Sequence, residues 1–121
     1  MNETTKRVRE FLMVFKQIAD RRGIDVVPRR VNNQTLADIG LTKKNRYYEI
    51  LSLSVQDYCR GPLVDDSGMK GEVWVFGKSI ENVTIYIKLK IAEIEEKPHI
   101  AKCISFHEAK HPLKFPCMGA K

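Results

Sequence analysis

Apolar residues near the start of the chain recur at steps of three and four positions, which is the period of an amphipathic α-helix. The repeating set is Val8, Phe11, Leu12, Phe15, Ile18 and Ala19. Thr4 or Thr5 can cap the start of this helix, and Gly23 is typical of its end. The basic residues of its outer face include Lys6, Arg9, Lys16 and Arg22. We predict a basic amphipathic helix over residues 1–23. A charged outer face like this one is more often exposed to solvent than used to bind a partner.

Shorter helical patterns follow in residues 33–60. The preceding segment IDVVP predicts a short strand or an extended link, because Pro28 disfavours a helical conformation in the residue before it. The segment NNQTLADIG predicts a short helix that Gly40 stops, and Thr42 can cap a second helix through KKNRYYEILSLS. Ser54 can cap one more turn through VQDYCR. We therefore expect two or three small helices in this segment.

The hydrophobic period changes to two in residues 72–107, as expected for β-strands. The segment GPLVDDSGMKG precedes the change, and its glycines and proline predict a loop. Three runs of β-branched and aromatic residues then follow, EVWVFGK, VTIYIKLKI and HIAKCISFH, with short polar segments between them. We predict one α+β domain, in which N-terminal helices precede a three-stranded antiparallel meander and residues 108–121 form a tail.

Because side chains alternate along a strand, the pattern also assigns faces to the predicted sheet. The core-facing residues of the second and third strands would be Val83, Ile85, Ile87, Leu89, Ile91, Ile104 and Phe106. The polar face would carry Thr84, Tyr86, Lys88, Lys90, Cys103, Ser105 and His107. Val73 and Val75 would be the buried pair of the first strand. Glu72, Trp74 and Phe76 would then join the polar face.

Composition narrows the class of protein. Hydrophobic residues at 43% and charged residues at 30% are ordinary values for a globular protein. No run approaches the roughly 18 apolar residues of a membrane span, and MNETTKRVRE lacks the apolar core of a signal peptide, so we expect a cytoplasmic protein with no membrane partner. Cys59, Cys103 and Cys117 contain no C-x-x-C pair, which is consistent with a reducing compartment.

The charge balance favours polyanionic partners. The sequence has 21 Lys and Arg against 15 Asp and Glu, which gives a formal net charge of +6 at pH 7. A basic protein of this kind attracts nucleic acid, although the charge alone also suits a protein that is merely soluble and basic.

One short motif raises the alternative of a metal site. His107, Glu108 and His111 spell H-E-x-x-H, the pattern of a zinc-protease helix. That chemistry needs both histidines one helical turn apart on a stable helix. Here His107 ends a predicted strand, and Pro112 disfavours helical geometry at His111. We therefore expect no metal ion and no cofactor.

The predicted polar face gathers the groups that metal-free RNA cleavage needs. One group must take the proton of the ribose 2′-hydroxyl, another must protonate the leaving 5′-oxygen, and cations must stabilise the charge on the phosphate. Tyr86, Lys88 and His107 could fill these roles, and Trp74 could stack on an unpaired base. The alternative is a solvated sheet face that is polar and has no catalytic role.

The second half of the chain resembles the motility quorum-sensing regulator (MqsR) toxin family. The resemblance covers about residues 36–110 and rests on LADIGLTKKNRYYEILSLSVQDYCR, EVWVF, IYIKLKI and CISFHEAK, which follow in the order and spacing of that family. It implies a RelE-like α+β toxin fold and a ribosome-independent, metal-independent endonuclease that acts on messenger RNA. It also implies a cognate antitoxin as a protein partner.

Carried over residue by residue, the resemblance also implies site residues. Tyr86 falls on the active-site tyrosine of the family. Arg60 stands where the family has a lysine, and His107 stands where the last strand of the family presents a lysine. The family's glutamine on the first strand would fall on Val73, and only a shift of alignment would bring Glu72 there.

We therefore expect an endoribonuclease toxin that cleaves single-stranded RNA by general acid/base catalysis. Arg60 and Lys88 would hold phosphate, Tyr86 would position or protonate it, and His107 would act as acid or base. The predicted RNA-binding residues are Lys90, Trp74 and Glu72. Two alternatives stay open: a module that binds RNA without cutting it, and an interaction protein whose N-terminal helix docks on another chain.

Overall fold

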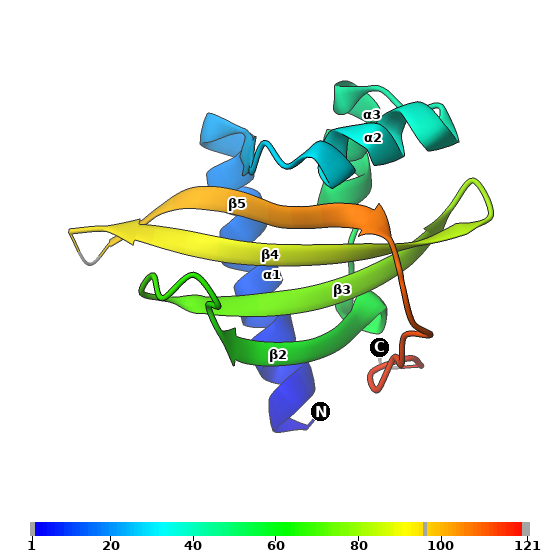
Figure 1. Cartoon of the computed structure of the whole chain (residues 1–121). Coiled ribbons are helices and arrows are strands. Elements are labelled where there is room, and N and C mark those ends of the chain that lie inside the picture. Colours follow the sequence, from blue (N-terminus) through cyan, green and yellow to red (C-terminus); the bar gives the residue numbers. More distant parts are fainter. Residues whose placement is uncertain (1, 96, 120–121) are drawn as a thin grey trace.

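The computed structural model describes residues 2–95 and 97–119, so Met1, Glu96 and the last two residues of the predicted tail lie outside the described residues. Within the described part the chain forms three α-helices, one 3-10 turn and one sheet of five strands, an α+β fold (Figure 1). The elements are α1 (Glu3–Arg22), β1 (Ile24–Val26), α2 (Arg30–Ile39), α3 (Lys43–Leu51), η1 (Val55–Asp57), β2 (Tyr58–Val64), β3 (Glu72–Ile80), β4 (Val83–Ile94) and β5 (Lys97–Glu108).

The first helix, α1, packs across one face of the sheet (Figure 1). Its buried residues are Thr5, Val8, Phe11, Leu12, Phe15 and Ala19. The Phe11 ring stacks on Trp74 of β3, with 5.1 Å between the ring centroids. The helix ends before Gly23 as predicted, but its cap is Asn2, whose side chain accepts a hydrogen bond from the backbone N–H of Thr5. None of the described helices combines the length and apolar character that crossing a bilayer requires.

The sheet is larger than the predicted three-stranded meander. Its strand order is β1-β5-β4-β3-β2, in which β1 runs parallel to β5 and the other neighbours are antiparallel. The strand β2 comes from a segment predicted as a helix end and a loop, so residues 58–60 are strand and not helix. Register shifts on both sides of Arg60 accommodate Gly61, whose φ is +130°. Glycine and proline are tolerated here because β2 is an edge strand, where bulges can interrupt the ladder.

Alternation along β4 predicts its faces correctly. Ile85, Ile87 and Leu89 are completely buried in the core, whereas Tyr86 and Lys88 point to the other face and are half-buried. One face of this strand packs towards α1 and the other is partly open to solvent. Such a strand shows a clear alternation of apolar and polar residues, so its faces can be predicted.

A bulge changes the faces along β5. Ser105 pairs with Lys88, but the next pair along is Leu89 with Cys103, so one residue of β5 is left over. Cys103 is therefore completely buried in the core, and its predicted position on the polar face is wrong. Ile104, predicted to be buried, lies in the bulge and is only half-buried. Ser105 keeps its predicted face.

The orientation of β3 is the reverse of the prediction. Trp74 pairs with the buried Leu89 and stacks on the α1 side, so it belongs to the core. Val73 and Val75 lie on the opposite face and are buried there as well. Because apolar residues occupy consecutive positions of this strand, a period of two cannot decide which set faces the helix. Glu72 shares the face of Trp74.

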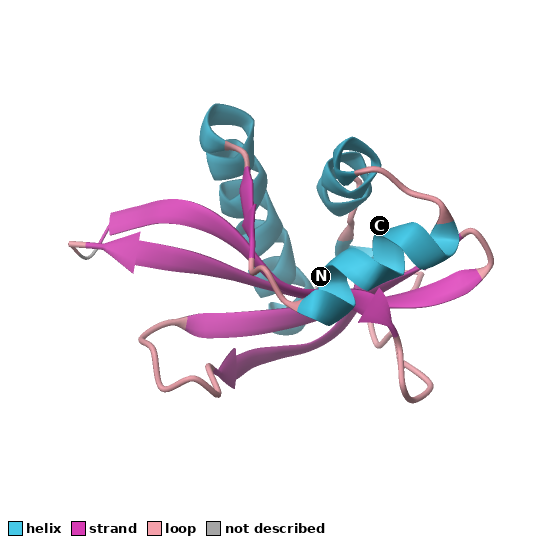
Figure 2. Cartoon of the chain, turned by 45° about the horizontal axis from the view of Figure 1, so that its top comes forward, coloured by secondary structure: helices cyan, strands magenta, loops and turns pink. Residues whose placement is uncertain are grey.

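Of the two remaining helices, α2 packs against β5, and α3 contacts α1 through the Tyr47 hydroxyl, which donates to the backbone oxygen of Ala19 at 3.2 Å (Figures 1 and 2). The helix α2 starts at Arg30, earlier than predicted, and ends before Gly40, which adopts the predicted left-handed conformation with φ +73°. Thr42 caps α3 as predicted, because its hydroxyl accepts from the backbone N–H of Asn45 at 3.0 Å.

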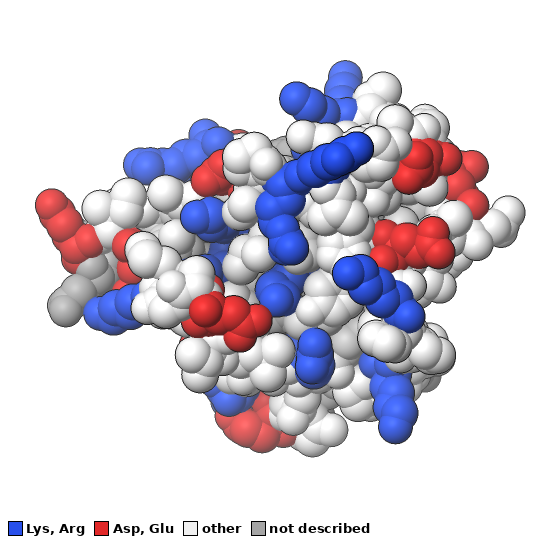
Figure 3. All heavy atoms as spheres, in the orientation of Figure 1, with Lys and Arg blue, Asp and Glu red and all other residues white. Residues whose placement is uncertain are grey.

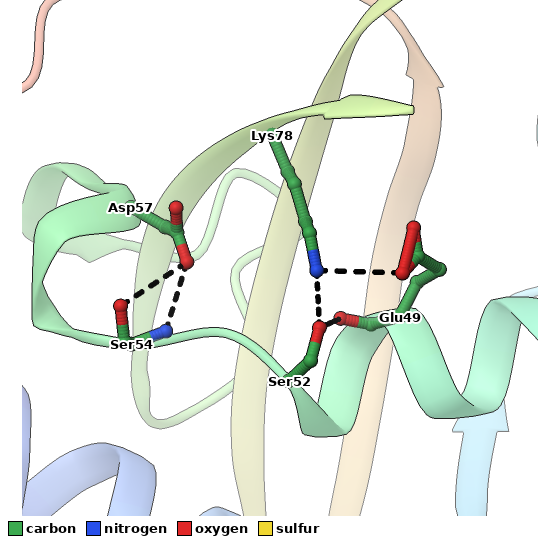
Figure 4. Close-up of polar contacts among 5 residues, drawn as sticks. All are labelled: Glu49, Ser52, Ser54, Asp57 and Lys78. Carbon is green, nitrogen blue, oxygen red and sulfur yellow. Dashed lines mark hydrogen bonds and ion pairs between the residues drawn. The ribbon is translucent and has the colours of Figure 1, made fainter. Parts of the chain in front are cut away.

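Polar contacts hold the segment between α3 and β2 in place (Figure 4). Lys78 of β3 donates to Ser52 and lies 3.3 Å from the Glu49 carboxylate at the end of α3. Asp57 of η1 accepts from the backbone N–H of Ser54 at 2.9 Å. Because β2 follows η1 directly, these contacts also set where Arg60 lies.

Candidate functional site

A cleft with a volume of about 640 Å³ opens on the face of the sheet opposite α1. The four residues predicted to be catalytic, Arg60, Tyr86, Lys88 and His107, all line it. They come from β2, β4 and β5. Antiparallel pairing of these strands through β3 therefore brings together side chains that are far apart in the sequence.

Tyr86 and His107 form the centre of this group. They are direct partners across β4 and β5, and their rings stack with 5.3 Å between centroids and 20° between planes. The His107 Nδ1 atom lies 3.0 Å from the backbone oxygen of Glu108. A carbonyl oxygen only accepts hydrogen bonds, so Nδ1 must carry a proton in this contact. In the neutral ring the lone pair is then on Nε2, which is the atom that can accept a proton.

Positive charge surrounds the two rings. Lys88 follows Tyr86 on the same face of β4, and the exposed Arg60 lies beyond Val75 on β2. No Asp or Glu is among the described residues that line the cleft. Lys and Arg side chains gather over the centre of this face of the molecule (Figure 3). Focused positive charge of this kind attracts polyanions.

Arg29 lines the same cleft, although no motif in the sequence points to it. It precedes α2, and its Nη1 atom donates to the hydroxyl of the buried Ser105 at 3.2 Å. A guanidinium held in this way is suited to binding phosphate oxygens. The contact joins residues that are far apart along the chain, so no local pattern predicts it.

Asn32 of α2 holds the strand that carries His107. Its side-chain amide donates to the backbone oxygens of Val27, at 3.1 Å, and Ile104, at 3.0 Å. Its side-chain oxygen accepts from the backbone N–H of Phe106 at 3.0 Å. Asn32 is completely buried, and so is its bond with Phe106, so this side chain satisfies a backbone N–H beside the bulge that water does not reach. The sequence contains no signal that singles out this asparagine.

The tail after β5 folds back over the cleft side of the sheet (Figure 1). Leu113 and Phe115 cover Gly77 of β3 so closely that a Cβ at this glycine would lie 3.2 Å from the Phe115 ring and would clash with Leu113. Further along, Cys117 is buried, and the Thr5 hydroxyl of α1 donates to its sulfur at 3.7 Å. The basic tail residues that line the cleft are Lys110, His111 and Lys114.

The residues predicted to bind RNA do not line the cleft. Trp74 is buried under α1, where the Arg7 guanidinium lies 5.7 Å from its ring centroid. Glu72 lies on the same side, 3.9 Å from Arg7, so the predicted placement of both residues beside Tyr86 is wrong. Lys90 lies on the expected face, but only 4% of it is exposed and its ammonium is 2.6 Å from the Asp65 carboxylate.

The H-E-x-x-H residues do not form a helix. His107 and Glu108 end β5, and His111 follows in a bend. Over residues 2–95 and 97–119, no group of three or more His, Cys, Asp and Glu side chains is placed to hold a metal ion.

Cys59 also lines the cleft, but it is poorly suited to act as a nucleophile. Burial raises the pKa of its thiol to about 11, so the thiol stays protonated at neutral pH. The thiolate is the reactive form of cysteine, and little of it is present here. The chemistry of the cleft therefore depends on the histidines, the tyrosine and the cations.

The ion pair at Lys90 predicts a pH-dependent contribution to stability. Hydrogen bonds from Lys90 and Ser67 hold the pKa of the Asp65 carboxyl well below its usual range. A lowered pKa in the folded state stabilises the protein above the unfolded-state pKa of about 3.9, and the contribution is lost as the pH falls towards the folded-state pKa. Asp65→Asn should lower the free energy of unfolding at pH 7 by about 2 kcal/mol, because it leaves the buried Lys90 ammonium without its charged hydrogen-bond acceptor.

Urea unfolding of the wild type and the variant between pH 7 and pH 2 measures this contribution. The difference in free energy should shrink as the pH falls below about 4. Asp66→Asn, at the exposed neighbouring residue, is the matched control and should show no such difference. A difference that stays constant over the whole pH range would contradict the assignment.

The cleft thus brings together a histidine that can accept a proton, a tyrosine hydroxyl and several cations. These groups are able to bind a phosphodiester and to move protons at it. No protein-family model, curated protein or solved structure matches the chain.

Proposed function

We propose that the protein is a metal-independent endoribonuclease that cleaves single-stranded RNA. The observation that carries the proposal is the cleft in which the stacked Tyr86 and His107 lie among cations, with no carboxylate among the described residues of its lining. A carboxylate-free, basic lining favours a polyanion over an acidic or neutral metabolite. The histidine adds a group that transfers protons near neutral pH.

The proposed reaction starts at the ribose 2′-hydroxyl. His107 takes its proton at Nε2, and the 2′-oxygen attacks the adjacent phosphorus. The bond between phosphorus and the 5′-oxygen then breaks as the leaving oxygen takes up a proton from an acid in the cleft, which gives a 2′,3′-cyclic phosphate and a 5′-hydroxyl end. Lys88 and Arg60 stabilise the negative charge that builds up on the non-bridging oxygens, and the Tyr86 hydroxyl positions the phosphate.

A single strand suits this reaction better than a duplex. The attacking 2′-oxygen must come into line with the leaving 5′-oxygen, and the regular backbone of an A-form helix does not place them so. Proteins that recognise RNA also reach unpaired nucleotides most easily, because their bases can be splayed out and stacked. The α+β architecture and the resemblance to the MqsR toxins support a toxin role within a RelE-like fold. A cognate antitoxin would then be the partner that restrains the activity.

Incubation of the purified protein with labelled single-stranded RNA of mixed sequence tests the proposal. We expect cleavage that leaves cyclic-phosphate ends and that proceeds at the same rate in excess EDTA, because side chains carry every step. A matched oligonucleotide with 2′-deoxyribose at every position should stay intact, since it lacks the attacking hydroxyl.

The other outcomes point to the alternatives. Binding of RNA that stays intact at all protein concentrations would favour a module that binds without cutting. Neither binding nor cleavage would favour a protein-interaction role. Cleavage that EDTA abolishes and zinc restores would favour a zinc site formed by His107, Glu108 and His111.

A further inference from the structure

We propose that His111, on the tail, is the general acid that protonates the leaving 5′-oxygen. The inference rests on the proposed ribonuclease function and extends it to a second catalytic histidine. The chain has histidines at positions 99, 107 and 111. His107 and His111 line the same cleft, one from the end of β5 and one from the tail that folds back over the sheet.

The leaving oxygen needs an acid of its own. His107 holds the proton that it has taken from the 2′-hydroxyl, so another group must supply a proton when the phosphorus–oxygen bond breaks. The cleft also offers lysine, arginine and tyrosine side chains. Among these residue types, histidine is the one that most readily gives and takes protons near neutral pH, so a second histidine is the better donor.

The tail holds His111 from both sides. Before it, the backbone N–H of Ala109 donates to the backbone oxygen of Thr84 at 2.9 Å, which extends the pairing with β4 by one residue. After it, Leu113 and Phe115 pack on Gly77. His111 is itself exposed, so its imidazole can reach a bound nucleotide and exchange protons with water. A segment anchored at both ends loses less freedom when substrate binds than a free terminus does.

The resulting step balances in protons and electrons. His107 gains the 2′-proton as the 2′-oxygen forms its bond to phosphorus. His111 gives its proton to the 5′-oxygen as the bond between the 5′-oxygen and phosphorus breaks. The reaction leaves His107 protonated and His111 neutral. Exchange with water restores both rings before the next turnover.

Cleavage of two RNA substrates by three histidine variants tests the assignment. The first substrate is ordinary RNA, and the second has sulfur in place of the 5′-oxygen at one linkage. A thiolate leaves without being protonated, so this linkage does not need the acid. We expect His111→Ala to cut ordinary RNA about a hundredfold more slowly than wild type and to cut the sulfur linkage within about threefold of the wild-type rate.

The controls separate an acid from a structural role. His107→Ala should be slow on both substrates, because it lacks the base, and His99→Ala, outside the cleft lining, should match wild type on both. His111→Ala that cuts ordinary RNA at the wild-type rate, or that is equally slow on both substrates, overturns the assignment. Wild-type protein that cuts neither substrate overturns the proposed function itself, and the role of His111 falls with it.

Discussion

Replacing His107 with alanine is expected to slow RNA cleavage about a hundredfold or more, which is the usual contribution of a group that transfers a proton in the rate-limiting step. The melting temperature should stay nearly unchanged, because the ring is only half-buried and makes one hydrogen bond, to the backbone of Glu108. Single-turnover cleavage and thermal unfolding of the same preparation measure both effects. Wild-type-like cleavage by the folded alanine variant would remove His107 from the mechanism.

His107→Lys distinguishes proton transfer from simple charge. A lysine restores a positive charge beside Lys88, and it is also the residue that the resembling family presents at this position. If the position mainly supplies charge to the phosphate, the lysine variant should keep much of the activity. We expect it to be as slow as the alanine variant, because a lysine with a usual pKa of about 10.4 is a poor base near neutral pH.

Asn32→Ala is expected to lower the free energy of unfolding by about 3 kcal/mol, the largest stability effect that we predict for a polar residue of this chain. The substitution leaves the buried Phe106 N–H, which water does not reach, and the part-buried Ile104 carbonyl without their side-chain partner. An unpaired buried group costs more than the net value of a hydrogen bond, because its desolvation is no longer compensated. The melting temperature should fall by roughly 10 °C.

Asn33→Ala is the matched control for this variant. Asn33 is the next residue of the same helix and is exposed, so its replacement should change stability by less than about 0.5 kcal/mol. Urea unfolding at neutral pH compares the two variants directly. The Asn32 variant should also cleave RNA more slowly than wild type below its melting range, because Phe106 immediately precedes His107. Equal stability of the two variants would show that Asn32 does not hold β5.

The sequence predicts the type and the buried face of those elements that bury only one face. In α1 the apolar residues recur with the helical period, and the structure buries Val8, Phe11 and Phe15 on one side as predicted. In β4 the alternation separates Ile87 from Lys88 in the same way. Such elements are predictable because burial of a single face imposes a regular period on the residues of the element itself.

The faces of β3 and β5 cannot be predicted fully from the sequence, because neighbouring elements in the fold interrupt their regular alternation. In β3, apolar side chains occupy both faces, so a period of two places Trp74 on the wrong side of the sheet. In β5, the bulge at Ile104 reverses the face of Cys103 but leaves His107 in place. A bulge depends on its pairing partner and on the buried amide of Asn32, which belongs to a different part of the chain.

By itself, the sequence determined the α+β class, the first helix and the two faces of β4, because local periodicity carries that information. It also pointed to Arg60, Tyr86, Lys88 and His107, through alternation and through the family resemblance. The tertiary structure alone decided that these four side chains share one cleft with Arg29 and with His111 of the tail. Strand pairing, the bulge and the packing of the tail on Gly77 set those neighbours. These are contacts between distant segments, and no local pattern of hydrophobic and polar residues encodes them.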